Sequence, residues 1–147
     1  MPEGPLNTSL TGVNVNRNRY KVNYWEDPVV KELVCDIVRT LGLEYIDMDR
    51  LYCFRSRGSR SKVYARIYGL PRILQKALRT AAIYVIEIVS ENFDRLSEEE
   101  RLKVLIHELL HIPYTFSGAL RPHNSKLDDE VVEELYRSYK SRKSGNI

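Results

Sequence analysis

The sequence predicts a single α+β domain, and two observations carry this prediction. The chain has 147 residues, 43% hydrophobic and 29% charged, which suits one hydrophobic core and does not suit a disordered or fibrous protein. Apolar residues at helical spacing mark several helices, and short runs rich in β-branched and aromatic residues between them indicate strands.

Residues 1–24 are rich in Asn, Gly, Pro and Thr and predict an extended or poorly ordered N-terminal arm. The domain is expected over 25–142, followed by a frayed tail over 143–147. The first helix is expected over 27–42, because Asp27 suits the N-cap and Pro28 the first helical position. Gly42 suits the position just past the helix end.

Three strands are expected next. Residues 45–56 and 62–70 are predicted to form a hairpin with a basic tip. A short helix or turn is expected over 71–78. The run AAIYVIEIVS, residues 81–90, is the clearest strand pattern in the chain.

A well-marked helix begins after Ser97, which forms an S-x-x-E capping box with Glu100. Pro113 ends this helix after Ile112. A loop over 113–126 and a last helix over 127–142 complete the predicted domain.

Composition also bounds the class of protein. The net charge of +3 is too small to imply nucleic-acid binding by itself. The chain has no apolar run of the ~18 residues that a membrane span needs, and no secretory signal pattern, so we expect a cytoplasmic protein without a membrane partner. Cys35 and Cys53 are expected to be small buried residues, and the sequence leaves open a disulfide between them.

All three histidines fall between residues 107 and 123. His107 and His111 are four residues apart on the predicted helix, so their imidazoles share a face and can reach the same ion. Glu108 follows directly, at a position that suits a base acting on a metal-bound water. The opposite side of this helix is apolar and is expected to anchor it in the core through Leu102, Leu105, Leu109 and Ile112.

A catalytic zinc ion needs a third protein ligand and one open coordination position. His123 lies in the loop after Pro113 and is the favoured third ligand. The downstream helix offers acidic alternatives, namely Asp129, Glu130, Glu133 and Glu134. We expect one Zn²⁺ ion, with Glu108 activating zinc-bound water for attack on a carbonyl and then passing the proton to the leaving amine.

Other candidate residues and segments have two interpretations each. Tyr114 and Arg121 could stabilise an oxyanion or could be structural. The basic segment 55–66 could bind nucleic-acid phosphates or be a solvated turn, with Arg55, Arg57, Arg60 and Lys62 as the candidate contacts. Either 62–70 or 81–90 could be an edge strand that pairs with a peptide substrate, or both could be core strands.

The string HELLHIPYTFSGALRPH, with SRSKVYARIYGLPR and YVIEIVSENFDRLS upstream, resembles small metallopeptidases of archaea and phages, which are distantly similar to SprT-like proteases. The resemblance covers about residues 25–140. It implies a minimal zincin fold, in which a short mixed sheet packs on an active-site helix, with N- and C-terminal helices. It also implies zinc bound by His107, His111 and His123, with Glu108 as the base. The metzincin pattern H-E-x-x-H-x-x-G-x-x-H is not matched, which excludes that subgroup.

The sequence supports two candidate functions, one of an enzyme and one of a non-catalytic binding protein. The first is a zinc-dependent metallopeptidase acting on proteins or peptides. The alternative is a non-catalytic, zinc-containing nucleic-acid-binding or phage accessory module that uses the basic segment 55–66. Glu108 favours the enzyme, because a closed structural zinc site has no use for a base beside an open position.

Overall fold

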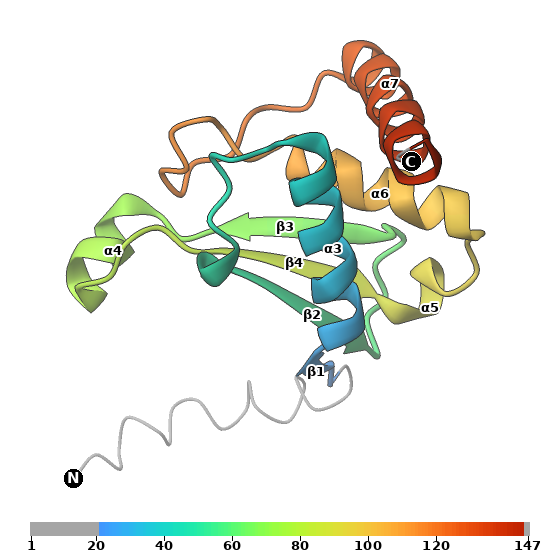
Figure 1. Cartoon of the computed structure of the whole chain (residues 1–147). Helices are drawn as coiled ribbons and strands as arrows, with labels where there is room; N and C mark the ends of the chain where they lie inside the picture. The colour runs from blue at the N-terminus through green and yellow to red at the C-terminus, as the bar shows by residue number, and fades with distance from the viewer. Residues whose placement is uncertain (1–20, 146–147) are drawn as a thin grey trace, which may run out of the picture.

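The computed structural model describes residues 21–145, in which helices pack on a four-stranded sheet (Figure 1). The strands are β1 (Asn23–Glu26), β2 (Leu51–Arg57), β3 (Ala65–Gly69) and β4 (Tyr84–Val89). The helices are α3 (Pro28–Leu41), η2 (Met48–Arg50, a 3-10 helix), α4 (Arg72–Leu78), α5 (Ser90–Phe93), α6 (Glu98–Leu109) and α7 (Ser125–Ser144). The predicted α+β class is confirmed.

The sheet is mixed and open, with the strand order β1-β2-β4-β3. β2 runs parallel to β4, and β1 and β3 pair antiparallel with β2 and β4 respectively. The predicted hairpin of 45–56 with 62–70 is therefore wrong, because β4 lies between these strands. Burial explains the order, since β4 is the most apolar strand and its central place buries Tyr84, Ile86, Ile88 and Val89.

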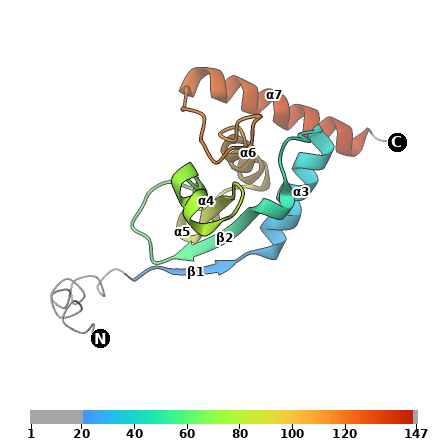
Figure 2. The ribbon, with the colours of Figure 1, turned by 90° about the vertical axis from the view of Figure 1, so that its left-hand side faces the viewer.

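Helices α3, α6 and α7 lie on one side of the sheet, as the two ribbon views show (Figures 1 and 2). Contacts of α3 with β2, α6 with β3, and α7 with both helices enclose one core. Its wholly buried side chains include Val34, Ile37, Leu51, Ile86, Leu105 and Ile106. Within residues 21–145, no helix has both the length and the apolar character needed to cross a membrane.

The caps of α3 agree with the prediction. The Asp27 side chain accepts the N–H of Val30, and Gly42 ends the helix with a positive φ of 70°. The arm predicted over 1–24 lies mostly outside the described residues, but its last two residues, Asn23 and Tyr24, belong to β1. β1 completes the sheet by pairing with β2.

Some boundaries differ from the prediction for local reasons. The strand predicted from residue 45 begins only at Leu51, because the Asp47 side chain accepts the N–H of Asp49 and starts η2 instead. α7 is longer than the predicted 127–142, and the Asn124 side chain caps its start. The two cysteines are unpaired. Cys53 is buried in β2 and Cys35 is half-buried on α3.

Candidate metal centre

α6 carries the first two residues of the predicted site and is fixed at its start. The Ser97 hydroxyl accepts the N–H of Glu100, and the Glu100 carboxylate accepts the N–H of Ser97, so the capping box is confirmed. The predicted apolar side is buried, with Leu102, Leu105, Leu109 and Ile112 at most 5% exposed. His107 therefore lies on the half-buried side of a firmly anchored helix.

His111 comes from the turn that ends this helix. The α-helix was expected to run to Ile112 but ends at Leu109, and the His111 N–H bonds the Glu108 carbonyl in a tighter turn. Arg121 holds this turn. Its N–H donates to the His111 carbonyl at 2.7 Å, and its guanidinium donates to the Leu110 carbonyl. The Arg121 carbonyl in turn lies 2.8 Å from Nδ1 of His111, which fixes the ring and leaves Nε2 for an ion.

The loop before α7 carries His123 and is held by residues distant in sequence. The buried Tyr84 hydroxyl accepts the N–H of Gly118 and donates to the carbonyl of Ala119, both at 2.7 Å. The Gln75 amide donates to the Ser117 carbonyl at 2.9 Å. No sequence signal could identify Tyr84 or Gln75, because both act more than thirty residues from the loop.

Two glycines allow the close approach of this loop to the sheet. Gly118 has a φ of +97°, which strongly favours glycine, and a Cβ there would overlap the Leu70 carbonyl. A Cβ on Gly69 would overlap the carbonyl oxygen of Gly118. The path of the loop from Pro113 back towards α6 therefore depends on the absence of both side chains.

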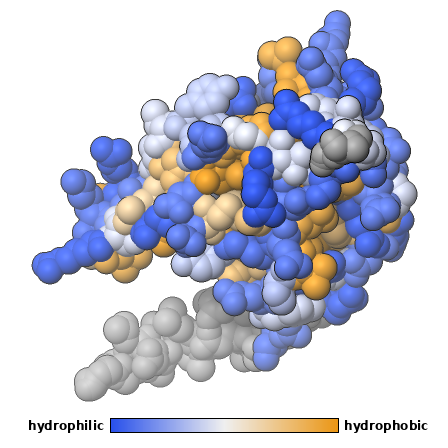
Figure 3. Space-filling view, viewed as in Figure 1, coloured by the Kyte–Doolittle hydropathy of each residue, from blue (hydrophilic) through white to orange (hydrophobic). Residues whose placement is uncertain are grey.

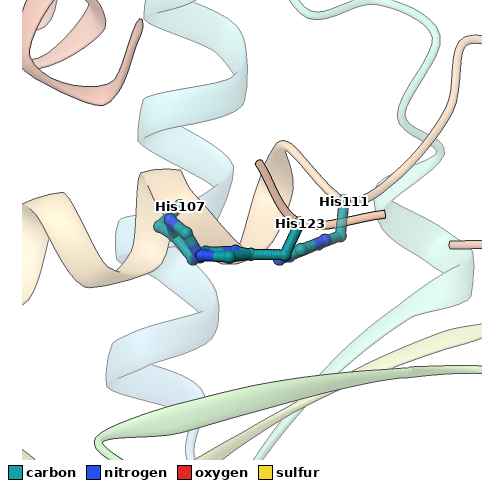
Figure 4. Close-up of side chains that lie close together, drawn as sticks. All are labelled: His107, His111 and His123. Atoms are coloured by element: carbon teal, nitrogen blue, oxygen red, sulfur yellow. The ribbon is translucent and has the colours of Figure 1, made fainter. Parts of the chain in front are cut away.

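The three histidines converge on one point (Figure 4). One nitrogen atom from each of His107, His111 and His123 lies within 4.8 Å of the other two. The ring centroids are 5.0 to 5.9 Å apart. Burial lowers the pKa of His107, and the two neighbouring imidazoles lower it further, which favours the neutral form that binds metals.

Among the described residues, this is the group of histidine, cysteine and acidic side chains that could hold a metal ion. The acids proposed as alternative third ligands are not part of it. Glu133, for example, accepts a bond from Lys103 at 2.9 Å. Three imidazole nitrogens fit the donor set of a catalytic zinc site, in which a fourth position stays open.

Asp128 lies behind His123 and was not singled out from the sequence. Its carboxylate is 6% exposed, accepts the N–H of Asn124 at 2.9 Å, and lies 3.6 Å from Nδ1 of His123. A carboxylate behind a ligating histidine orients the ring and raises its basicity. The spacing of five residues after His123 is the sequence signal that could have identified it.

Glu108 lies beside the cluster, in a cleft of about 530 Å³. Its side chain is almost fully buried, and burial raises the pKa of its carboxyl to about 7 against the opposing effect of the Arg66 guanidinium. The cleft runs between the start of β3, α6 and α7. It is lined by Lys62, Val63, Tyr64, Ala65, Lys103, Val104, His107, Glu108, Asp129, Val132 and Glu133.

Tyr114 and Arg121, the candidate oxyanion stabilisers, line a different hollow. Tyr114 is 83% exposed and packs edge-on against the ring of Tyr45. Arg121 is bonded to the end of α6, as described above. Both contacts favour the structural interpretation, and a role in the chemistry stays a prediction.

The predicted basic tip is a connection that crosses from β2 past β4 to β3. Asn92 holds it by donating from its side-chain amide to the carbonyls of Ser61 and Val63. Arg55 is 18% exposed and pairs with Asp27 at 2.6 Å and with Asp94 at 2.8 Å.

The other candidate contacts of this segment are also placed by the fold. Arg57 lies 3.8 Å from Asp94, Arg60 lies in the connection itself, and Lys62 lines the cleft beside His107. Acids distant in the sequence thus pair with Arg55 and Arg57, although no acid interrupts the segment itself. This arrangement gives the nucleic-acid alternative no support beyond the composition of the segment.

A protein-family model matches most of the chain, including the candidate site. The family model described as "Putative phage metallopeptidase" matches residues 22–142, which include the sheet, α6 and all three histidines. The chain belongs to this phage metallopeptidase family. No curated protein and no solved structure matches the chain. The family description implies a metal, and the three histidines are a group that could hold one.

Proposed function

We propose that the protein is a zinc-dependent metallopeptidase that hydrolyses peptide bonds, with Glu108 as the base. The observation that carries the proposal is the convergence of three imidazole nitrogens within 4.8 Å, beside a buried carboxyl at the wall of a cleft. The family supports the peptidase part of the proposal.

His107, His111 and His123 would hold the ion, and the chain supports this role in two places. The Arg121 carbonyl accepts the Nδ1 proton of His111, and Asp128 lies where it can do the same for His123. When bound, zinc would polarise the carbonyl of the scissile bond and acidify a coordinated water molecule. That the bound ion is zinc is part of the proposal.

Glu108 would move the proton. A carboxyl whose pKa is raised by burial is suited to take a proton from the attacking water and to return it to the departing amine. The burial that raises this pKa also keeps the carboxyl close to the histidines.

An extended substrate would lie along β3, which is an edge strand, whereas β4 has a neighbour on each side and is excluded from this role. The Val89 N–H bonds the Tyr64 carbonyl, and the Leu70 N–H bonds the Ile83 carbonyl. By the alternation of antiparallel pairs, the backbone groups of Ala65 and Ile67 therefore point away from β4. These groups are placed to bond a peptide backbone, and Ala65 lines the cleft next to the site.

The proposal is tested with wild-type protein and Glu108→Gln, by measuring bound zinc and the hydrolysis of casein or a peptide library. We expect zinc to be retained in both proteins and hydrolysis to be lost in the variant. Absence of zinc from both proteins, or unchanged hydrolysis in the variant, contradicts the proposal.

The third ligand is tested by His123→Ala, with Glu134→Ala as the matched control. Glu134 is exposed on α7 and was one of the acidic alternatives. We expect His123→Ala to lose zinc and Glu134→Ala to keep it. The opposite result would assign the third position to the acidic helix.

A further inference from the structure

α4 is a short amphipathic helix that leaves its apolar side on the surface. At about 100° per residue, Ile73, Leu74, Ala77 and Leu78 lie within an arc of roughly 140°. Ile73 is 75% exposed, Leu74 45% and Leu78 65%, and no residue of α4 is buried. A surface helix ordinarily turns such a side towards the core.

The helix projects from the body of the molecule and is held mainly by polar contacts (Figures 1 and 2). Gln75 donates to the Leu70 carbonyl at its start and to the loop carbonyl of Ser117. Behind its end, Arg50 bonds the Thr80 hydroxyl and the Ala82 carbonyl. Among residues 21–145, none covers the apolar side, and seven residues are too few for a helix to be stable on local propensity alone. These observations indicate a partner outside the described part of the chain.

The charges beside the apolar side define the chemistry of that partner. At about 100° per residue, Lys76 lies roughly 60° and Arg72 roughly 100° from Ile73, so both border the apolar side at this edge. Arg79 caps the end of the helix. Residues 70–80 contain no acid, and no ion pair joins these three cations to another described residue. Figure 3 shows hydrophilic side chains around this protrusion, with hydrophobic ones among them. The partner must therefore accept apolar side chains and carry negative charge nearby.

We propose that α4 binds the surface of an anionic lipid membrane. Apolar side chains flanked by arginine and lysine are the pattern of helices that lie in the interface, with the aliphatic groups below the phosphates and the cations among them. A convex protrusion fits a surface that can deform around it. The helix would lie on the surface and would not span it.

Two other occupants fit the observations less well. Two copies of α4 packed face to face would bring their cations together, and they would bury far less than the roughly 800 Å² per partner of a stable interface. A nucleic acid would neutralise the cations but would leave Ile73 and Leu78 without a partner. The membrane surface accounts for both the charge and the apolar side chains.

The experiment uses the full chain and sedimentation with two kinds of vesicle. One is phosphatidylcholine alone, and the other contains phosphatidylserine at about one part in three. We expect binding to the anionic vesicles only, weakening as salt is raised. Ile73→Ser combined with Leu78→Ser should weaken this binding at least tenfold, and Lys76→Glu at least fivefold, since one basic residue near the surface contributes about 1 kcal/mol.

The matched control is Val29→Ser, because Val29 is 74% exposed on α3, a helix that lies apart from α4 (Figure 1). Its binding should equal that of wild type. Circular dichroism and thermal melting show that each variant is folded. The proposal is overturned if wild type does not bind anionic vesicles, or binds both kinds equally, or if the double variant binds like the control. Loss of a wild-type dimer in the double variant, without vesicle binding, would instead assign the face to a second copy.

Discussion

Replacing Tyr84 with phenylalanine tests how the third histidine is held in place. The Tyr84 side chain is wholly buried, and its hydroxyl is the hydrogen-bond partner of the buried N–H of Gly118 and the exposed carbonyl of Ala119. Water can replace the hydroxyl at Ala119 but not at Gly118. A buried donor without a partner costs about 1–3 kcal/mol, so we expect a loss of about 2 kcal/mol. For a chain of this length, this lowers the melting temperature by roughly 4–8 °C.

The same free energy acts on metal binding, because the loop that Tyr84 holds also carries His123. If the loop opens by itself, the loss weakens zinc affinity by roughly 5- to 150-fold and leaves global stability nearly unchanged. Urea unfolding in EDTA measures the free energy of unfolding, and competition with a chromophoric chelator measures the zinc affinity. A change in either one supports the role of the hydroxyl.

Tyr114→Phe is the matched control, because it makes the same substitution within the loop that Tyr84 contacts, at a side chain that is 83% exposed. It should leave both quantities within about 0.5 kcal/mol of wild type. The reasoning is refuted if Tyr84→Phe is indistinguishable from Tyr114→Phe in both assays, since the loop would then be held without the hydroxyl.

Three further predictions concern the rest of the fold. Arg55→Met should lower the free energy of unfolding by about 2 kcal/mol, because it removes the charge-assisted hydrogen bond to the half-buried Asp27 carboxylate. Arg57→Met, at a 56% exposed side chain, should have almost no effect, and equal losses in the two would contradict this. Native protein should react with Ellman's reagent at Cys35 alone, since burial raises the pKa of Cys53 to about 12, and two thiols should react in denaturant. Hydrogen bonds from tyrosine and lysine side chains on α7 lower the pKa of Asp36 below its ordinary value of 3.8. The carboxylate therefore contributes to the free energy of unfolding above pH 3.8, and this contribution is lost as the pH falls through the lowered pKa. Asp36→Asn should cost stability at pH 7 and little in acid, and a loss that does not depend on pH would refute the assignment.

The sequence alone was sufficient for the local elements of the site. The capping box at Ser97, the helical spacing of His107 and His111, and the apolar side of the same helix are set by interactions between residues a few positions apart. The caps of α3 at Asp27 and Gly42 were predictable for the same reason. Such interactions do not depend on how the remainder of the chain folds.

The order in which the strands pair could not be predicted from the sequence. The strand at 62–70 follows the strand at 45–56 directly, and nearness in the chain favoured a hairpin. The burial of β4 between them decided the actual order. This one fact makes β3 the edge strand beside the histidines. It also makes the second half of the basic segment a connection that crosses β4, while Arg55 in β2 pairs with acids distant in the sequence.

The position of His123 shows the division most clearly. The sequence determined that His123 follows the helix after a proline and can turn back, and it left the acids of the next helix as alternatives. Only the tertiary structure brought the His123 ring within reach of the other two, through the hydroxyl of Tyr84, the amide of Gln75 and the close contact of Gly69 with Gly118. Periodicity and caps are short-range, and therefore readable in sequence. The position of a loop depends on groups that meet only after the sheet has formed.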